Sequence, residues 1–527
     1  MVPAARYGGL TPMRLLLSLL LFLPLCAAEV RKPNILVILA DDLGYGDVQC
    51  YNPERGKIPT PNIDKLASQG MRFTDGHSSS GVCTPSRYTL LTGRYHWRTS
   101  LQRGVLGGMS PPLIAPDRLT IAGLLKQHGY ATACVGKWHL GVTMPQPLTE
   151  GTIQNGPTTH GFDYYFGISA SLDMPPYALI ENDRFTEAPT AVKNFLILSD
   201  DRKNPLVMSG ERRFNREGPG APGFESVQAL PAFAAKSVEW IKAHQNQPFL
   251  LYLALNSPHT PLAPTKEWKG KSGLGDYADF VMQTDAVVGE VMAALEETGA
   301  TRNTMVILSS DNGPASYVGT GVSENPRDSQ EDGYPIKNLE AKGHFPAGPL
   351  RGYKASVYEG GHRVPFIIRW PEVVKPGSVC GQLVHQADLI RTFADVVGAT
   401  LPDNAGEDSF SLLPLLRGED KPIRGQAICA TGTPSLRQGP WKLIMAADTD
   451  SNAKDLPPVQ LYNLADDLAE TKNLAAALPE KVAEMKALLE KLITDGRSTP
   501  GAAQKNDIEV VRYPREEAPK RKANAKK

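Results

Sequence analysis

The sequence predicts an α/β protein with a large, mixed but mainly parallel sheet that helices cover on both faces. A smaller C-terminal antiparallel sheet with one helix is expected to follow. Three observations predict this fold: short apolar runs alternate with segments of helical period, the runs lack a polar face, and the pattern changes near residues 402–408. Apolar strands that alternate with helices are typical of parallel sheets buried on both sides.

The predicted strands of the large sheet are short and almost wholly apolar. NILVILA at residues 34–40 shows no alternation of polar and apolar side chains, which fits a strand covered on both faces. The other predicted strands span residues 131–135, 248–255, 304–309 and 364–369. The predicted helices span residues 119–128, 231–244, 277–298 and 385–397.

The remainder of the chain predicts a small C-terminal unit. Strands are expected at residues 426–431, 441–445 and 459–462, and a helix at 479–494. We therefore place one domain at residues 29–402 and a second at 403–499. Residues 500–527 are charged and unpatterned, and we expect a disordered basic tail. Two long irregular segments, 189–224 and 314–349, are typical of functional loops.

The first 28 residues have the pattern of a signal peptide. Arg6 and Arg14 precede the apolar run LLLSLLLFLPLCAA, which small residues end at Ala28. The run is too short to span a bilayer, which takes about 20 helical residues. We expect a secreted or periplasmic protein without a stable membrane anchor. A lipid anchor on Cys26 is the alternative, and the bulky Leu25 disfavours it.

The charge balance gives no support for a nucleic-acid binder, so we expect no nucleic-acid partner. The 56 basic side chains balance the 56 acidic ones, whereas nucleic-acid binders carry a basic excess. Five cysteines remain after the signal segment, without C-x-x-C spacing for a metal. Because five is an odd number, these cysteines cannot all pair in disulfides within the chain, and at least one needs another explanation.

Polar residues follow several predicted strands at the point where each strand ends. Ligands of open α/β sheets bind beyond the carboxyl ends of the strands, so these residues mark a site. Carboxylate and amide oxygens suit Ca²⁺ or Mg²⁺, although a single aspartate there is usually a cap or turn residue. The oxygen donors are Asp41, Asp42, Asp311 and Asn312, and the other strand-end residues are Lys137, His139 and His259.

Cys83 is expected at the beginning of a helix. Pro85 fits the first turn and Gly93 can end the helix. Free backbone N–H groups at a helix N-terminus favour anions, and Arg87, one turn later, could hold an anion with two hydrogen bonds. A cysteine in such a place is otherwise a packed small residue.

The motifs C-T-P-S-R at residues 83–87, G-K-W-H-L-G at 136–141 and D-N-G at 311–313 occur in one order along the chain. In these motifs the chain resembles the formylglycine-dependent sulfatases, an arylsulfatase-like family of the alkaline phosphatase superfamily. The resemblance runs from residue 33 almost to the end. It implies a sulfuric ester hydrolase that releases inorganic sulfate from a sulfated carbohydrate or an aryl sulfate. It also implies a maturation enzyme that converts Cys83 to Cα-formylglycine.

The resemblance implies a role for each site residue. Asp41, Asp42, Asp311, Asn312 and the modified Cys83 match ligands of a divalent metal, normally Ca²⁺. Arg87 matches the residue that steadies the hydrated aldehyde. Residues that match contacts to the sulfate are Lys137, Lys354 and Ser171, and those that match proton donors or acceptors are His139 and His259. A serine lacks the second hydroxyl of the aldehyde hydrate, so a Cys83→Ser variant is expected to lose turnover.

Two other functions are compatible with these residues. A phosphate or phosphonate ester hydrolase of the same superfamily would share the sheet, but phosphatases there more often use two zinc ions with several histidine ligands. A non-catalytic glycan-binding relative would leave Cys83 unmodified. Substrate specificity is expected to reside in the loops, where each candidate could equally be a packing residue. These candidates are Asp173, Tyr177, His344 and Arg351.

Overall fold

The computed structural model describes residues 1–5, 8–9, 32–193, 216–318, 336–432, 434–445, 457 and 459–512. The chain divides into two units, Met1–Arg31 and Lys32–Lys527, and everything below concerns the second. The predicted signal peptide lies almost wholly outside the described residues.

The central strand β1 (Asn34–Asp41) shows why its sequence is continuously apolar. All eight of its residues are buried. Leu36 and Ile38 pack into one hydrophobic cluster, whereas Ile35 and Val37 pack into another on the opposite face of the sheet. Alternate residues of a strand point to opposite faces, so a strand covered on both sides needs apolar residues at every position.

Parallel strands form the centre of a ten-stranded sheet within the described residues. Its order is β13-β2-β12-β11-β1-β10-β4-β5-β6-β7. The five strands from β11 to β5 run parallel, while β12 is antiparallel to β11 and β6 to β5. The mixed, mainly parallel sheet is confirmed. The bounds are β2 Met71–Phe73, β4 Ala131–Lys137, β5 Tyr164–Ile168, β6 Ile180–Glu181, β7 Arg184–Phe185, β10 Phe249–Pro258, β11 Thr304–Ser310, β12 Phe366–Arg369 and β13 Ser378–Cys380.

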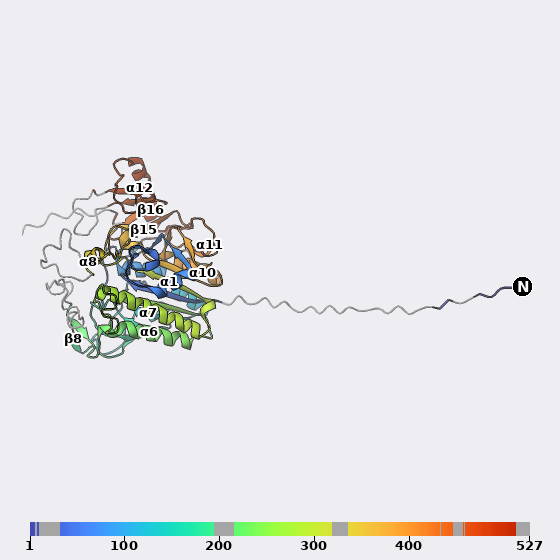
Figure 1. The fold of residues 1–527 in the computed structure, drawn as a ribbon, viewed down its shortest axis with the longest axis horizontal. Helices are drawn as coiled ribbons and strands as arrows, with labels where there is room; N and C mark the ends of the chain where they lie inside the picture. The colour runs from blue at the N-terminus through green and yellow to red at the C-terminus, as the bar shows by residue number, and fades with distance from the viewer. Residues whose placement is uncertain are drawn as a thin grey trace, which may run out of the picture. The chain divides into compact units, whose positions relative to one another are not determined.

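Helices cover both faces of this sheet. On one face α1 (Pro61–Ser68), α6 (Ser226–Ala243) and α7 (Asp276–Glu297) share a core with the strands. The green helices α6 and α7 lie side by side in Figure 1. The other face carries α2 (Cys83–Thr92), α3 (Ile121–Gln127), α10 (Leu389–Val397) and α11 (Leu413–Leu416).

Two predicted helix starts differ from the structure by four or five residues. We expected a helix to begin at Pro231, but α6 begins at Ser226 and Pro231 lies inside it. Pro231 is in the second turn, where a missing N–H removes a single backbone hydrogen bond, and Leu230 extends the apolar face. The predicted helix at 385–397 begins instead at Leu389, after a short 3₁₀ turn at Gln386–Asp388.

The C-terminal part forms a second, antiparallel sheet with one covering helix, as predicted. Leucines of the helix pack against the apolar face of the sheet, together with Tyr95 and Trp97 from the larger part of the chain. We did not predict β16, because its five residues between two glycines show no strong apolar pattern. The elements are β15 Gln426–Ala430, β16 Pro434–Gln438, β17 Trp441–Ile444, β18 Gln460–Asn463 and α12 Pro479–Thr494.

Residues 500–512, which we expected to belong to a disordered tail, instead contact the folded body. Asp507 pairs with Arg94 at 2.9 Å, and the Asn506 side chain accepts a hydrogen bond from Arg98 at 3.1 Å. Residues 513–527 lie outside the described residues. So do residues 194–215 and 319–335 of the predicted irregular segments, which the short elements β8 (Ala191–Lys193), β9 (Gly218–Gly220) and α8 (Ile336–Ala341) border.

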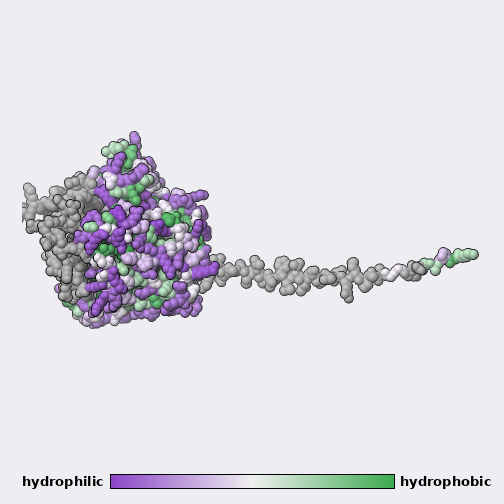
Figure 2. Space-filling view, in the orientation of Figure 1, coloured by the Kyte–Doolittle hydropathy of each residue, from purple (hydrophilic) through white to green (hydrophobic). Residues whose placement is uncertain are grey.

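Hydrophobic residues are scattered among hydrophilic ones on the face drawn in Figure 2. Among the described residues, no helix is both long enough and apolar enough to cross a membrane. The five described cysteines are free thiols, so none of them forms a disulfide with another.

Candidate active site

The parallel strands bring their polar carboxyl ends to one edge of the sheet. β1 ends at Asp41, β4 at Lys137 and β11 at Ser310, directly before Asp311. In the sheet β1 lies between β11 and β10, and β4 lies on the other side of β10, so residues far apart in the sequence meet there. Asp42 and His139 have the positive φ angles of 67° and 58° that turn the backbone away from the strands.

Each carboxylate of the cluster has a cationic partner. The Lys137 Nζ donates to Asp41 Oδ2 at 2.6 Å, and the Lys354 Nζ donates to Asp42 Oδ2 at 2.8 Å. Arg87 donates to Asp311 Oδ2 through Nε and Nη2, at 2.9 and 2.8 Å. All three carboxylates are fully buried.

The crowding of these charges shifts their pKa values. Burial, followed by the charge of Asp41, raises the pKa of Asp311 to about 7, although Arg87 and Lys137 act against the shift. Burial alone would also raise the pKa of Asp41, but Lys137 and other cations hold it well below its usual value. The carboxylates therefore repel one another, and a divalent cation among them would relieve that repulsion.

Oxygen atoms without partners mark where such a cation fits. Asp41 Oδ1 and Asn312 Oδ1 are buried and accept no hydrogen bond from any described residue. The Asn312 amide donates to Asp42 Oδ1 at 2.7 Å, which leaves its own oxygen available. One ligand atom each of Asp41, Asp42, Cys83 and His259 lies within 4.8 Å of the others. The oxygen donors of the cluster, Asp41, Asp42, Asp311 and Asn312, fit Ca²⁺ or Mg²⁺.

Cys83 is the first residue of α2, as the sequence predicts. Burial raises the pKa of its thiol, so the unmodified side chain is a neutral, weak nucleophile. Arg87 lies one turn further on. Its guanidinium donates to Asp311 and to the Lys137 carbonyl, so it holds a carboxylate rather than offering a free fork to an anion.

The two histidines use different ring nitrogens to bind backbone carbonyls, so a different nitrogen is left available in each. His139 Nε2 lies 2.7 Å from the Leu106 carbonyl and must donate to it, so the buried, unpartnered Nδ1 carries a lone pair. His259 Nδ1 donates to the Thr260 carbonyl at 2.5 Å, which leaves Nε2 facing Asp42 at 3.8 Å. Burial lowers the pKa of both rings, with help from Lys137 for His139 and from Lys354 for His259.

Ser171 joins the cluster from the loop after β5. Its hydroxyl accepts a hydrogen bond from Lys137 Nζ at 2.9 Å and lies 3.4 Å from His259 Nδ1. The structure therefore brings the predicted site residues together through contacts or close approach of their side chains, except that the ring of His139, two residues after Lys137, contacts Leu106.

Comparison with known proteins assigns the chain to a family. The sulfatase family model matches residues 33–399. This chain belongs to the sulfatase family. The N-acetylgalactosamine-6-O-sulfatase of Bacteroides thetaiotaomicron is 35% identical over 498 residues, which cover 88% of this chain and 94% of that relative. Arylsulfatase A of Homo sapiens is 32% identical over 529 residues, covering 94% and 96%.

Solved structures agree with this assignment. A structure from work on the metabolism of multiple glycosaminoglycans by Bacteroides thetaiotaomicron is 34% identical, with a TM-score of 0.77 over 88% of this chain and 99% of the other. A phosphonate monoester hydrolase of Agrobacterium radiobacter, 18% identical with a TM-score of 0.55, shares the fold alone. The protein is thus an enzyme that hydrolyses sulfate esters on an alkaline phosphatase-like fold. Its family implies formylglycine and a divalent metal.

Two of the four loop candidates for specificity in this sulfatase have structural roles. His344 is fully buried, where its Nε2 lies 2.9 Å from Asp47 and its Nδ1 accepts from the Lys57 amide at 3.0 Å. Arg351 donates to the Glu470 carbonyl at 2.6 Å and stacks on the Tyr358 ring. Neither contacts a residue of the active site.

Thr431, at the end of β15, is a residue that sequence reasoning missed. Its Oγ1 accepts a hydrogen bond from the Gly81 amide at 3.0 Å and lies 3.5 Å from the Ser356 carbonyl. The Ala355 amide also donates to the Gly81 carbonyl at 2.7 Å. The C-terminal sheet of the sulfatase thus contacts the segment that leads into Cys83 and the loop that carries Lys354. No sequence signal marks Thr431, which is 350 positions from Gly81.

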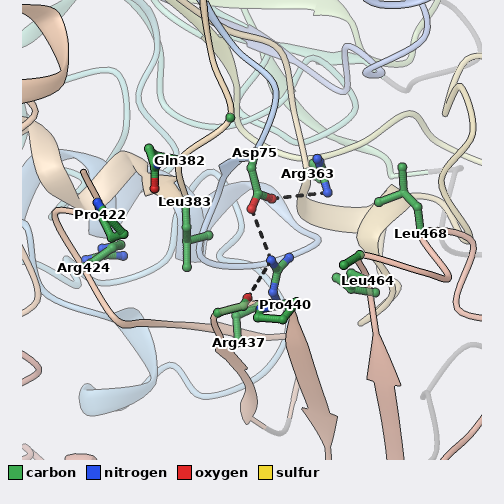
Figure 3. Close-up of a pocket in the computed structure, with 13 residues that line it drawn as sticks. Asp75, Arg363, Gln382, Leu383, Pro422, Arg424, Arg437, Pro440, Leu464 and Leu468 are labelled. Atoms are coloured by element: carbon green, nitrogen blue, oxygen red, sulfur yellow. Dashed lines mark hydrogen bonds and ion pairs between the residues drawn. The ribbon is translucent and has the colours of Figure 1, made fainter. Parts of the chain in front are cut away.

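A separate cavity lies beside the C-terminal sheet. Figure 3 shows Asp75 at its wall, paired with Arg363 and Arg437, each at 3.2 Å. The arginines of this wall also pair with buried carboxylates behind it, Arg363 and Arg437 with Glu359 and Arg424 with Asp388. None of the predicted catalytic residues lines the cavity.

Proposed function

We propose that this sulfatase releases inorganic sulfate from a sulfated carbohydrate, with a nucleophile made from Cys83. The observation that carries the proposal is the position of Cys83 within 4.8 Å of Asp41, Asp42 and His259, at a helix N-terminus. The name of the N-acetylgalactosamine-6-O-sulfatase relative, which aligns with 88% of this chain, supports a carbohydrate substrate.

Asp41, Asp42, Asp311 and Asn312 would hold the metal, for which Ca²⁺ is the proposed ion and Mg²⁺ the alternative. When present, the cation supplies positive charge beside the reacting group, and formylglycine supplies hydroxyl groups on one carbon. Arg87 holds Asp311 in place through its two hydrogen bonds. The orientation of the ligand set therefore depends on Arg87.

The sulfate group binds between two lysines. A sulfate monoester is an anion, so its oxygens need fixed positive charge before a nucleophile can approach. Lys137 pairs with Asp41 and Lys354 pairs with Asp42, so each ammonium group is held beside a different carboxylate of the cluster. Lys137 also contacts Ser171, whose hydroxyl can donate to a sulfate oxygen. The backbone N–H groups at the beginning of α2 add to this field.

The histidines move protons in opposite directions. His139 accepts a proton at Nδ1, because its Nε2–H is committed to the Leu106 carbonyl. His259 donates a proton from Nε2 to the departing alcohol oxygen. Burial lowers the pKa of His259, but an anionic substrate beside it raises that pKa and favours the protonated ring.

The cellular setting follows from the N-terminus and from Cys83. The signal-like segment at residues 1–28 supports a secreted or periplasmic enzyme. A maturation enzyme that oxidises Cys83 is the expected partner. The even charge balance supports no role for nucleic acid.

The test measures hydrolysis of an aryl sulfate and an aryl phosphate by the parent enzyme and by Cys83→Ser and Cys83→Ala variants. We expect the parent to prefer the sulfate, and both variants to lose multiple turnover. Cys50→Ser is the matched control, since Cys50 is a half-buried free thiol outside the site. Mass spectrometry of the Cys83 peptide reports formylglycine directly. Undiminished turnover by Cys83→Ser, or a preference for phosphate, would contradict the proposal.

A further inference from the structure

The loop after β5 carries a second polar residue beside the active site. Ser171 lies in this loop and contacts Lys137 and His259. Asp173 follows two residues later and is only 5% exposed. The Met174 amide donates to the Ser171 carbonyl at 2.9 Å, so a tight turn sets the position of Asp173 relative to the sulfate-binding residues.

The two oxygens of Asp173 have different surroundings. Its Oδ2 lies 3.3 Å from Arg216 Nη1, whose side chain is 35% exposed. Its Oδ1 is buried and has no hydrogen-bond partner in the described part of the chain. A buried carboxylate oxygen without a partner is costly, so this atom can accept a hydrogen bond from a donor that the described residues do not supply.

Tyr177 holds the Asp173–Arg216 pair in place. The phenol of this fully buried tyrosine donates to the Arg216 carbonyl and lies 3.5 Å from the Asp173 carbonyl. The Tyr177 backbone in turn bonds to Pro219 and Ala221, next to β9. The carboxylate is therefore preorganised, which reduces the entropy cost of binding a ligand.

Tyr317 is a half-buried residue on which charges of both Asp173 and the active site act. Burial raises the pKa of its phenol, on which the charges of Lys354, Asp42 and Asp173 also act. Lys354 and Asp42 contact each other within the active site. Asp173 lies two residues after Ser171, which contacts Lys137, so the turn at Ser171–Met174 places Asp173 beside the sulfate-binding residues.

We infer that Asp173 Oδ1 accepts a hydrogen bond from a hydroxyl of the sugar ring that carries the sulfate, and that Asp173 is a specificity-determining residue. The inference rests on the proposed carbohydrate sulfatase activity and names the recognition chemistry of that site. A ring hydroxyl is the donor that a carbohydrate offers within a few bonds of the sulfate, whereas a simple aryl sulfate has none. Binding the hydroxyl satisfies Oδ1, and an analogue without it leaves a buried carboxylate oxygen without a hydrogen bond.

The experiment measures kcat/KM for N-acetylgalactosamine 6-sulfate and its epimer, and for an aryl sulfate. The quantity of interest is kcat/KM for the better sugar sulfate divided by kcat/KM for the aryl sulfate. We expect Asp173→Ala to reduce this ratio by about 10- to 100-fold, and Asp173→Asn to reduce it less, because the amide still offers an oxygen of the same shape. Asp183→Asn, a matched change on the surface of the protein, keeps the parent ratio.

A second measurement identifies the hydroxyl. Monodeoxy analogues of the preferred sugar sulfate are compared in the parent and in Asp173→Ala. Removing the contacted hydroxyl slows the parent but has no further effect in the variant, since the two changes remove the same interaction.

The outcomes separate this inference from the proposed function. A parent that hydrolyses neither substrate class contradicts the proposed function. A parent that hydrolyses aryl sulfate but prefers neither sugar, or an Asp173→Ala variant with an unchanged ratio, overturns the role of Asp173. If removal of each hydroxyl slowed the Asp173→Ala variant as much as it slows the parent, the role of Asp173 would be overturned as well.

Discussion

Thr431→Val tests whether the C-terminal sheet positions the catalytic loops. Valine has the shape of threonine but cannot accept the hydrogen bond from the buried Gly81 amide. An unsatisfied buried N–H costs about 1–3 kcal/mol, and the 3.5 Å contact to Ser356 adds little, so we expect the free energy of unfolding to fall by about 1–2 kcal/mol. Gly81 is two residues before Cys83. A displacement of about 1 Å at a reacting group costs roughly 100-fold, so a partial shift should lower kcat about 10-fold.

The assay combines urea unfolding with initial rates on an aryl sulfate. Thr431→Ser is the matched variant, because it keeps Oγ and loses a methyl group. We expect its kcat to remain within about 3-fold of the parent, since the Gly81 bond survives. If Thr431→Val loses stability yet keeps the kcat of Thr431→Ser, the loops hold their positions without this hydroxyl. The reasoning from the C-terminal sheet to the active site would then fail.

Three further predictions concern the metal site and two buried ionisable residues, Arg87 and His96. Chelation of the metal should lower both activity and the unfolding midpoint, and added Ca²⁺ should restore them; a dialysed protein unchanged in both would contradict the cation site. Arg87→Met leaves Asp311 buried without its partner and should cost about 3–5 kcal/mol in urea unfolding, unlike the partly exposed control Arg391→Met. Burial lowers the pKa of His96 from 6.5 to about 3, so the unfolded chain binds more protons between these values. Stability should therefore fall below pH 6.5 by about 1.4 kcal/mol per pH unit, a slope that His96→Asn should reduce.

Much of the fold and the composition of the site could be predicted before any coordinates. Side chains of a strand alternate between faces, so the uniform apolar run at residues 34–40 required covering layers on both sides. Parallel neighbours end at a common edge, so Asp41, Lys137 and Asp311 could be expected together. These inferences succeed because periodicity and strand direction are properties of the local chain.

Tertiary packing alone decided which side chain contacts which. Arg87 could have held an anion, but the structure pairs it with Asp311, 224 positions away. Three further features have no periodic pattern in the sequence that would indicate them. These are the antiparallel pairing of β12 with β11, the hydrogen bond between Thr431 and Gly81, and the Asp173–Arg216 pair. Such contacts depend on how loops pack over the edge of the sheet. Hydrogen bonds act over about 3 Å, and no local pattern in the sequence determines distances that small between distant segments.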